Sequence, residues 1–463
     1  DYFLRVAESR LARLHFIVRA RPGKAAEIDV ADLERRIAGA AKPWTDELEE
    51  ILVEKHGSEN GQRLMATFGR AFPAAYREDV SPWVTVFDVE NASAVFGGEP
   101  IRMSLYRPRE PRGGIIRFKL FRMDAPTPLT AVMPLLENLG LSMVNERPYE
   151  LELPDGRALW IQDFDMKPAA GEAIDLDSVR DVFQEAFRSV LEGEAESDGF
   201  NRLVIASQMH WRQVAVLRAY CKFLLQANIP FSDHYMAESV SRPPGLSRLL
   251  VELFEARFDP ARARESAEQR REAQAALENT LRPIFGTYCE RDPGLAGYID
   301  DLIGARARKP SEQEDAARLA FERGLQFVAS LDEDRILYAF FEVINATLRT
   351  SFFQPAADGG HKPWISFKID SGALPELPRP RPFREIFVYG PRVEGVHLRF
   401  GKVARGGLRW SDRREDFRTE VLGLVKAQQV KNAVIVPVGS KGGFVPKRLP
   451  PPEEGRAAWL EEG

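Results

Sequence analysis

The sequence contains few of the residues that build disulfide frameworks or metal sites. Among 463 residues there are two cysteines, Cys221 and Cys289, and six histidines, no two of which stand at the i, i+4 spacing of a helical metal site. The cysteines lie far apart and match no metal-binding spacing, so we expect neither a disulfide scaffold nor a metal site. So little cysteine is typical of a reducing compartment, and we expect a cytoplasmic protein.

The chain also lacks a strong net charge and a long apolar run. Its 64 Lys and Arg and 69 Asp and Glu give a net charge of -5, without the clustered cationic face that nucleic-acid binding needs. No stretch approaches the ~20 apolar residues of a membrane-spanning helix. We therefore expect neither nucleic acid nor a membrane as a partner. The sequence begins Asp-Tyr-Phe, without a starting methionine or a signal-peptide layout, and we expect an excised segment of a longer protein.

The remaining composition is that of a soluble protein with several domains. Hydrophobic residues make up 44% and charged residues 29% of the chain, which are ordinary values for globular domains. At roughly 100–200 residues per domain, the length allows several of them. In the first part we predict a strand at 14–18, helices over 30–52 and then up to Pro73, and a strand at 82–89.

The next part of the chain has the clearest pattern. Apolar and polar residues alternate over 115–121, as in a half-buried strand. Thr127 and Pro128 form a helix start, and Gly140 is placed to end that helix. The β-α-β-β order predicts a small ACT-like (ferredoxin-like) domain over 80–170. Its last strands are predicted at 141–144, 149–153 and 158–161.

The rest of the chain divides by composition. Residues 171–380 have mostly helical periodicity, and they end in the proline-rich segment 374–382, which neither a helix nor a central strand accommodates. Glycine, arginine and lysine then become frequent, and we assign 381–463 to the incomplete start of another α/β domain. With 1–79 as the end of an ACT-like or helical unit, the sequence predicts an α+β multidomain protein.

The segment 401–447 concentrates glycine and cationic residues. Arg405 and Arg409 flank Gly406 and Gly407, where the backbone can turn tightly or approach a ligand closely. Such a set suits a small dianionic substrate, because each carboxylate needs charge-assisted hydrogen-bond donors.

A helix and a second glycine-rich stretch follow. The helix is predicted over 416–431, with Lys426 and Lys431 off its apolar face near its C-terminal end. Residues 439–443 are predicted as a loop that sets Lys441 among glycines. A lysine crowded by other cations can act as a base near neutral pH. From the residues alone, the segment is an anion site with an activated lysine.

This segment resembles the substrate-binding part of glutamate dehydrogenases. The family pattern is Lys-Gly-Gly-Ile/Leu-Arg, a helix carrying a lysine, and Pro-x-Gly-Gly-x-Lys-Gly-Gly; the chain has ARGGLRW, VKN and PVGSKGG in that order. The spelling ARGGLRWSDRREDFRTEVLGLVKAQQVKN is similar to the large NAD-dependent branch, whose N-terminal regions carry ACT-like and helical parts. The resemblance is strong over about 380–447 and looser elsewhere. It implies that 381–463 is the start of the substrate-binding domain, an α/β dehydrogenase domain.

The resemblance also implies a role for each matching residue. Lys441 matches the catalytic lysine, which polarises the substrate carbonyl and activates water or ammonia. Lys431 matches the lysine that binds the α-carboxylate, and Arg405 stands where most members have a lysine for the side-chain carboxylate. The rest of the implied substrate site consists of Gly406, Gly407, Arg409 and Lys426.

The implied cofactor is NAD, and the implied substrates are L-glutamate and 2-oxoglutarate. The resemblance further implies a homo-oligomer with small-molecule effectors at its ACT-like domains. No G-x-G-x-x-G fingerprint occurs in the chain. We therefore expect NAD to be bound by a domain outside this sequence, and the chain alone to be inactive. The alternative is that the chain is a non-catalytic regulatory and assembly region that binds small effectors such as amino acids.

The proposed site residues also have structural alternatives. Lys441 would then be a solvent-exposed turn lysine, and Lys426 a solvated helix lysine. Arg409 would be an ion-pair partner of Asp412 or Glu415. Three further residues are predicted to be packed in the core: His210, His397 and Cys221.

Overall fold

The computed structural model forms two compact units. It describes residues 2–5, 13–16, 29–40, 42–108, 114–169, 174–432 and 439–462. The first unit consists of Asp1–Arg102, Phe121–Ala125 and Tyr149–Ile161. The second unit consists of Met103–Leu120, Pro126–Pro148 and Gln162–Gly463.

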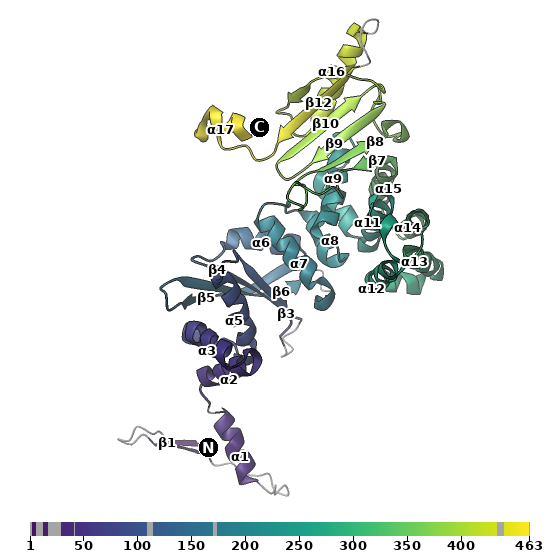
Figure 1. The fold of residues 1–463 in the computed structure, drawn as a ribbon. Coiled ribbons are helices and arrows are strands. Elements are labelled where there is room, and N and C mark those ends of the chain that lie inside the picture. Colours follow the sequence, from purple (N-terminus) through teal and green to yellow (C-terminus); the bar gives the residue numbers. More distant parts are fainter. Residues whose placement is uncertain are drawn as a thin grey trace. The chain divides into compact units, whose positions relative to one another are not determined.

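The first unit is mainly helical (Figure 1). It starts with an antiparallel hairpin of β1 (Tyr2–Arg5) and β2 (Arg13–Phe16). Five helices follow: α1 (Val30–Ala40), α2 (Trp44–His56), α3 (Ser58–Phe68), α4 (Ala74–Asp79) and α5 (Pro82–Phe96). The helices predicted over 30–52 and up to Pro73 are confirmed, although a break after Ala40 divides the first of them.

The predicted strand at 82–89 is wrong, because this segment is the first half of α5. Ser81 precedes the helix and Pro82 occupies its first position. A backbone amide at this position has no partner within the helix, so a proline, which has no amide hydrogen, is tolerated there. The buried side chains then recur every three residues, at Val86, Val89, Ala92 and Val95. The β-branched residues of the segment suggest a strand locally, and the burial of one helical face against the unit's core overrides that preference.

The core of the first unit is aromatic. Tyr76 packs against Phe72 and Tyr149, with ring centroids 4.6 and 5.1 Å apart. The Tyr149 hydroxyl donates to Asp79 at 2.7 Å, and the Trp44 indole donates to the Val80 carbonyl at 2.9 Å. These polar tips are satisfied while their rings stay buried, so the rings stabilise the core without an unpaired group.

The next element is a four-stranded sheet in the order β3-β4-β6-β5. Its strands are β3 (Arg102–Tyr106), β4 (Ile116–Met123), β5 (Leu141–Glu152) and β6 (Ala158–Pro168), with helices α6 (Leu129–Asn138) and α7 (Leu176–Leu191). The predicted strand at 115–121 and the helix after Pro128 are confirmed. β5 is one continuous strand where two were predicted, and β3 was not predicted. Phe118 of β4 contacts Phe183 and Phe187 of α7, so α7 packs on this face of the sheet.

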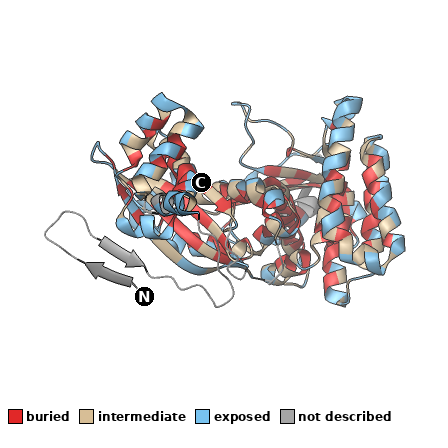
Figure 2. Ribbon diagram, turned by 90° about the horizontal axis from the view of Figure 1, so that it is seen from below, coloured by how far each residue is buried: buried red, intermediate tan, exposed pale blue. Residues whose placement is uncertain are grey.

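Helices dominate the second unit from α7 to residue 346. They are α8 (Arg202–Ala206), α9 (Trp211–Gln226), α10 (Asp233–Ser241), α11 (Pro244–Phe258), α12 (Ala267–Arg291), α13 (Pro293–Arg306), α14 (Pro310–Leu325) and α15 (Leu331–Ala346), with 3-10 turns at Gly199–Asn201 and Arg262–Arg264. Most of them carry one buried and one exposed face (Figure 2). Cys221 is fully buried in α9, as predicted, whereas His210 and His397 are only half-buried. No helix among the described residues is long and apolar enough to cross a membrane.

The chain then forms a six-stranded sheet in the order β11-β12-β10-β9-β8-β7. The strands are β7 (Thr347–Thr350), β8 (Ile365–Ile369), β9 (Arg384–Tyr389), β10 (Val393–Arg399), β11 (Leu408–Trp410) and β12 (Ser440–Pro446). Its helical elements are a 3-10 turn at Ser371–Ala373, α16 (Phe417–Asn432), a 3-10 turn at Pro452–Glu454 and α17 (Gly455–Glu462). The proline-rich 374–382 lies between β8 and β9, which pair directly. The division of the chain into domains stays a prediction.

Candidate functional site

The predicted site residues lie on a β11–α16–β12 unit and on the segments directly next to its strands. β11 and β12 are parallel neighbours, and α16 connects them (Figure 1). A parallel pair needs such a crossover, which returns the chain to the end of the sheet where it started. The two glycine-containing segments of the sequence motif therefore meet although about thirty residues separate them.

Backbone contacts hold the two segments together. Arg405 forms a parallel bridge with Gly439, and the Ser440 amide donates to the Arg405 carbonyl at 3.3 Å. The Gly442 amide donates to the Gly407 carbonyl at 3.1 Å. These bonds extend the β11–β12 pairing toward the N-terminal side of both strands.

Gly406 has no room for a side chain. A Cβ added there would lie 1.5 Å from the Ser440 carbonyl oxygen, whereas one added at Gly407 would meet nothing within 4 Å. Gly406 therefore makes a close backbone contact within the protein, and the approach of Gly406 and Gly407 to a ligand stays a prediction. The close partner is the chain's own strand.

The prediction of a loop at 439–443 is wrong from Ser440 onward, because these residues begin β12. β12 is paired on both sides, with β10 and with β11. Its glycines make room for neighbours: a Cβ at Gly443 would lie 2.5 Å from Val421 of α16, and one at Gly442 would lie 2.3 Å from Leu408. Glycine is here a packing requirement of a central strand.

Lys441 lies half-buried in β12, so it is not the exposed turn lysine of the alternative interpretation. It pairs with Leu398 of β10, which in turn pairs with Glu385 of β9. Directly paired residues share a face of the sheet. Side chains alternate along a strand, so Lys441 shares its face with Gly443, the residue against which α16 packs. The side chain of Lys441 therefore leaves β12 on the face of the sheet that α16 covers.

The other predicted cations are placed less uniformly. Lys426 is exposed on α16, and the Arg405 side chain is exposed beside the bridge to β12. Lys431 lies in the last turn of α16. Residues 433–438, which connect α16 to β12, lie outside the described residues. The structure thus brings the backbones of Arg405, Gly406, Gly407 and Lys441 together.

Arg409 has a protein partner. Its Nε lies 2.5 Å from Oε1 of Glu420 in the first turn of α16, and the Ser411 hydroxyl donates to the other oxygen of Glu420 at 2.6 Å. The alternative that Arg409 is an ion-pair residue gains support, but with Glu420 in place of the predicted Asp412 or Glu415. This contact ties β11 to the start of α16.

A buried ion pair, which the sequence analysis missed, anchors α16 to the sheet. Arg418 donates from Nε to Glu385 at 2.8 Å, and both side chains are almost fully buried. The Ser371 hydroxyl donates to the same carboxylate at 2.7 Å. From α9, Gln226 accepts from the Arg418 amide at 3.1 Å. All four groups satisfy one another, which makes the burial of two charges tolerable.

No local signal in the sequence identifies this pair. Glu385 stands in the run Arg384–Tyr389, where apolar residues fall on both faces of the strand. Alternation therefore cannot show that Glu385 faces inward. Arg418 stands at the start of α16, directly after a cluster of charged residues, most of which are exposed.

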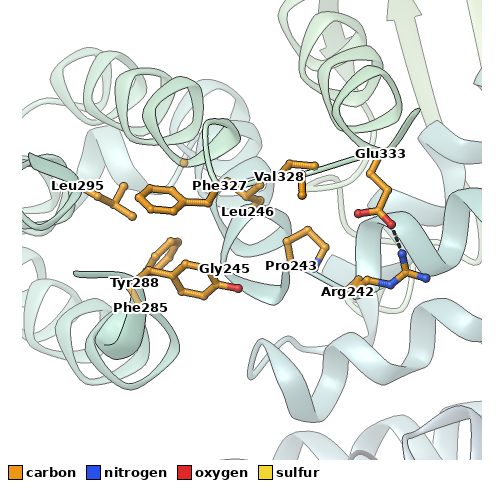
Figure 3. A pocket seen from close by; sticks show the side chains of 12 residues that line it. Arg242, Pro243, Gly245, Leu246, Phe285, Tyr288, Leu295, Phe327, Val328 and Glu333 are labelled. Carbon is orange, nitrogen blue, oxygen red and sulfur yellow. Dashed lines mark hydrogen bonds and ion pairs between the residues drawn. The ribbon is translucent and has the colours of Figure 1, made fainter. Parts of the chain in front are cut away.

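One cavity lies apart from these residues, in the helical region (Figure 3). Its volume is about 170 Å³. Aromatic and aliphatic side chains from α11 to α14 line most of it, and the Arg242–Glu333 ion pair lies at one end. None of the predicted site residues borders it. The side chains that line most of this cavity are apolar and cannot pair with the carboxylates of a dicarboxylate substrate.

The comparisons with known proteins cover most of the chain. Five family models for domains of glutamate dehydrogenase match: the ACT2 domain at 1–45, helical motif 2 at 51–95, the ACT3 domain at 100–179, helical motif 3 at 195–260, and the catalytic domain of bacterial NAD-glutamate dehydrogenase at 320–463. The chain is therefore composed of glutamate dehydrogenase domains.

Curated relatives give the same result. The NAD-specific glutamate dehydrogenases of Pseudomonas aeruginosa, Halomonas elongata and Mycobacterium tuberculosis are 43%, 42% and 37% identical over 97%, 100% and 99% of this chain. The matches cover 25%, 26% and 26% of those relatives, so the chain spans about a quarter of their length. The chain belongs to the family of NAD-specific glutamate dehydrogenases.

Proposed function

We propose that the protein containing this chain interconverts L-glutamate with 2-oxoglutarate and ammonium, using NAD. The observation that carries this proposal is the meeting of the ARGGLRW and GSKGG segments in adjacent parallel strands of a region that matches the catalytic domain. Two glycine-mediated contacts, at Gly406 and Gly443, fix the strand that carries Lys441. A catalytic group must be held in a fixed position, which a strand fixed in this way provides.

In this proposal Lys441 is the catalytic lysine. Its ammonium donates a hydrogen bond to the substrate carbonyl or, once deprotonated, takes a proton from the attacking water. Lys431 binds the α-carboxylate, and Arg405 binds the side-chain carboxylate with its planar fork. The remaining substrate contacts come from Gly406, Gly407, Arg409 and Lys426. Arg409 would share its guanidinium between Glu420 and substrate.

We propose that NAD is bound by a domain outside this chain, because the described residues lack the usual features of a dinucleotide site. Dinucleotide sites are built at the carboxyl ends of a parallel sheet, with a glycine-rich turn before a helix. Within the described residues, the strand pairs of the six-stranded sheet are antiparallel except for β11 with β12, and the sequence has no G-x-G-x-x-G. We place the NAD site outside this chain and expect the chain alone to be inactive.

Lysine substitutions in the full-length protein test the proposal. Lys441→Ala should lower kcat by about 10²-fold or more, as for loss of a positioned acid–base group. Lys431→Ala should mainly raise KM for glutamate, because it removes binding that ground and transition states share. Lys402→Ala is the matched control, since Lys402 is an exposed lysine close before the glycine segment. A kcat unchanged within a few-fold in K441A, or far better turnover of leucine or phenylalanine than of glutamate, would contradict the proposal.

A second role is effector binding by the ACT-like part of the chain. The match of the ACT3 model to 100–179 favours it. We propose a cytoplasmic homo-oligomer whose activity responds to small molecules such as amino acids. Sedimentation of the full-length protein measures its oligomeric state. Amino acids that change neither activity nor hydrogen exchange over 100–179 would contradict the regulatory role.

A further inference from the structure

Four of the described arginines of the second unit are buried, and one of these four has no carboxylate at ion-pair distance among the described residues. Arg418 pairs with Glu385 at 2.8 Å, Arg218 with Asp198 at 2.7 Å and Arg262 with Glu255 at 2.8 Å. Arg212, at 6% exposure, is the exception. Among the described residues its guanidinium donates only to two carbonyls, Phe352 O at 3.0 Å and Lys362 O at 3.4 Å.

A buried guanidinium that meets only neutral acceptors is costly, because carbonyl dipoles do not replace a counter-charge. The cost is visible in the pKa of Arg212, which burial lowers although the charge of Glu194 acts to raise it. Glu194 does not reach ion-pair distance. Burial also lowers the pKa of His361, and the nearby charge of Arg212 lowers it further. The charge of Glu194 acts to raise the pKa of His361 as well, without cancelling these two effects.

Arg212 lines a pocket of about 390 Å³. The pocket lies between the start of α9 and the hairpin that joins β7 to β8, and the two carbonyls bound by Arg212 stand at either end of that hairpin. The N-terminal end of a helix carries a partial positive charge, which favours an anion. The volume of the pocket is at the small end of the range for small-molecule binding sites.

Two of the acids near this pocket, Glu255 and Glu185, are already engaged. Glu255 accepts from Gln213 at 2.6 Å and pairs with Arg262. Glu185 lies 2.7 Å from Nε2 of His210, whose Nδ1 accepts from the Arg212 amide at 3.2 Å. These two carboxylates have their own donors, and Glu194 acts on Arg212 only from beyond ion-pair distance, so none of the three forms an ion pair with its guanidinium.

We propose that this pocket binds a small organic oxyanion, whose carboxylate or phosphate lies against Arg212 and whose ring-sized apolar body lies against Phe352 and Phe353. The fork of an arginine matches both oxyanions. Phe352 already stacks near the guanidinium, with its ring centre 4.8 Å from Cζ. Pro355 and the two phenylalanines give the pocket an apolar wall. The site is separate from the Lys441 segment, and the inference does not depend on the proposed reaction.

Calorimetric titration of the purified chain tests the charge first. Benzoate and phenyl phosphate should bind, and benzamide, which has the ring without the charge, should bind at least about 10-fold more weakly. The ratio of the two anion affinities distinguishes a carboxylate site from a phosphate site. Equal binding of benzamide, or no binding of either anion, would overturn the proposal.

Two substitutions then test the location. R212Q should weaken the binding of the better anion by about 10-fold or more, whereas R349Q, the same charge change at an exposed position of β7, should leave it unchanged. If R212Q does not fold, R212K keeps the charge without the fork and should bind with intermediate affinity. Equal losses in R212K and R349Q, or none in R212K, would show that the anion does not use this guanidinium.

Discussion

The β11–α16–β12 unit and the helical region are both closely packed at glycines, but Gly406 of the first meets backbone, whereas Gly245 and Gly324 of the second meet side chains. At Gly406 an added Cβ would meet a backbone carbonyl at 1.5 Å. At Gly245 of α11 it would meet the Phe285 ring at 2.6 Å, and at Gly324 of α14 it would meet a terminal carbon of Leu246 at 2.5 Å. A paired strand cannot move without losing its ladder, whereas a side chain can change rotamer.

The two regions also bury arginine differently. The Arg418–Glu385 pair below α16 is nearly inaccessible on both sides, at 1% and 0%. In the helical region Arg218 is as buried at 1%, but its partner Asp198 is 30% exposed. The close contact at Gly406 and the buried Arg418–Glu385 pair hold the β11–α16–β12 unit with groups that cannot adjust. This suits a strand that positions a lysine. The helical region keeps adjustable contacts and an open cavity.

Breaking the sheet's ion pair should have the largest effect. R418M leaves the Glu385 carboxylate buried without its cation, and we expect a loss of about 3–5 kcal/mol in the free energy of unfolding, measured by urea titration. R413M is the control, because Arg413 pairs with Asp416 on the surface and such pairs contribute about 0–1 kcal/mol. Similar losses in the two variants would mean that burial does not distinguish these pairs.

Replacing Gly406 of the β11–α16–β12 unit by alanine should have the second-largest effect on stability. G406A forces β11 away from β12, at a cost of about 3 kcal/mol, the upper end for overpacking. G407A is matched in chemistry and position, and its added methyl group meets nothing, so its unfolding midpoint should stay close to that of the original protein. If G406A were as stable as G407A, the close approach of Gly406 to Ser440 would not exist in solution.

Neither feature of the sheet unit was predictable from the local sequence. The glycines of 439–443 predicted a loop, because glycine is disfavoured in strands unless a neighbour needs the space. That neighbour is Val421 of α16, and only the fold brings it there. The same motif nevertheless located both segments that meet, since their spelling resembles the family pattern, and the catalytic-domain model of that family matches 320–463.

Elsewhere the local pattern decided how well prediction worked. Alternation over 115–121 and the proline-started helix after it were confirmed, because burial on one face and a helix start are local features. The strand predicted at 82–89 is a helix, because its β-branched residues are packed at helical spacing. The pocket at Arg212 needed contacts between α9 and the β7–β8 hairpin, which lie far apart in sequence.

Breaking the Arg218–Asp198 pair of the helical region should lower the free energy of unfolding by less, and by an amount that depends on pH. Burial would raise the pKa of Asp198, but the Arg218 charge and its hydrogen bonds outweigh that effect and lower it. The stabilisation is therefore present above the unfolded pKa of about 3.9 and is lost as pH falls through the lower folded value. D198N should cost about 1–3 kcal/mol at neutral pH and flatten the acid limb of a Tm–pH curve. An unchanged acid limb would argue against the pairing.

The smallest effects should come from the glycines of the helical region. G245A presses on the Phe285 ring, which lines the cavity of Figure 3 and can tilt into it, so we expect a loss of about 1 kcal/mol, the low end for overpacking. G324A presses only on the flexible end of Leu246. It also gains about 1 kcal/mol of helix propensity, because Gly324 lies inside α14. The two terms should nearly cancel in urea titration. A loss in G324A as large as that in G406A would show that side chains in this region are held as rigidly as the backbone of the sheet.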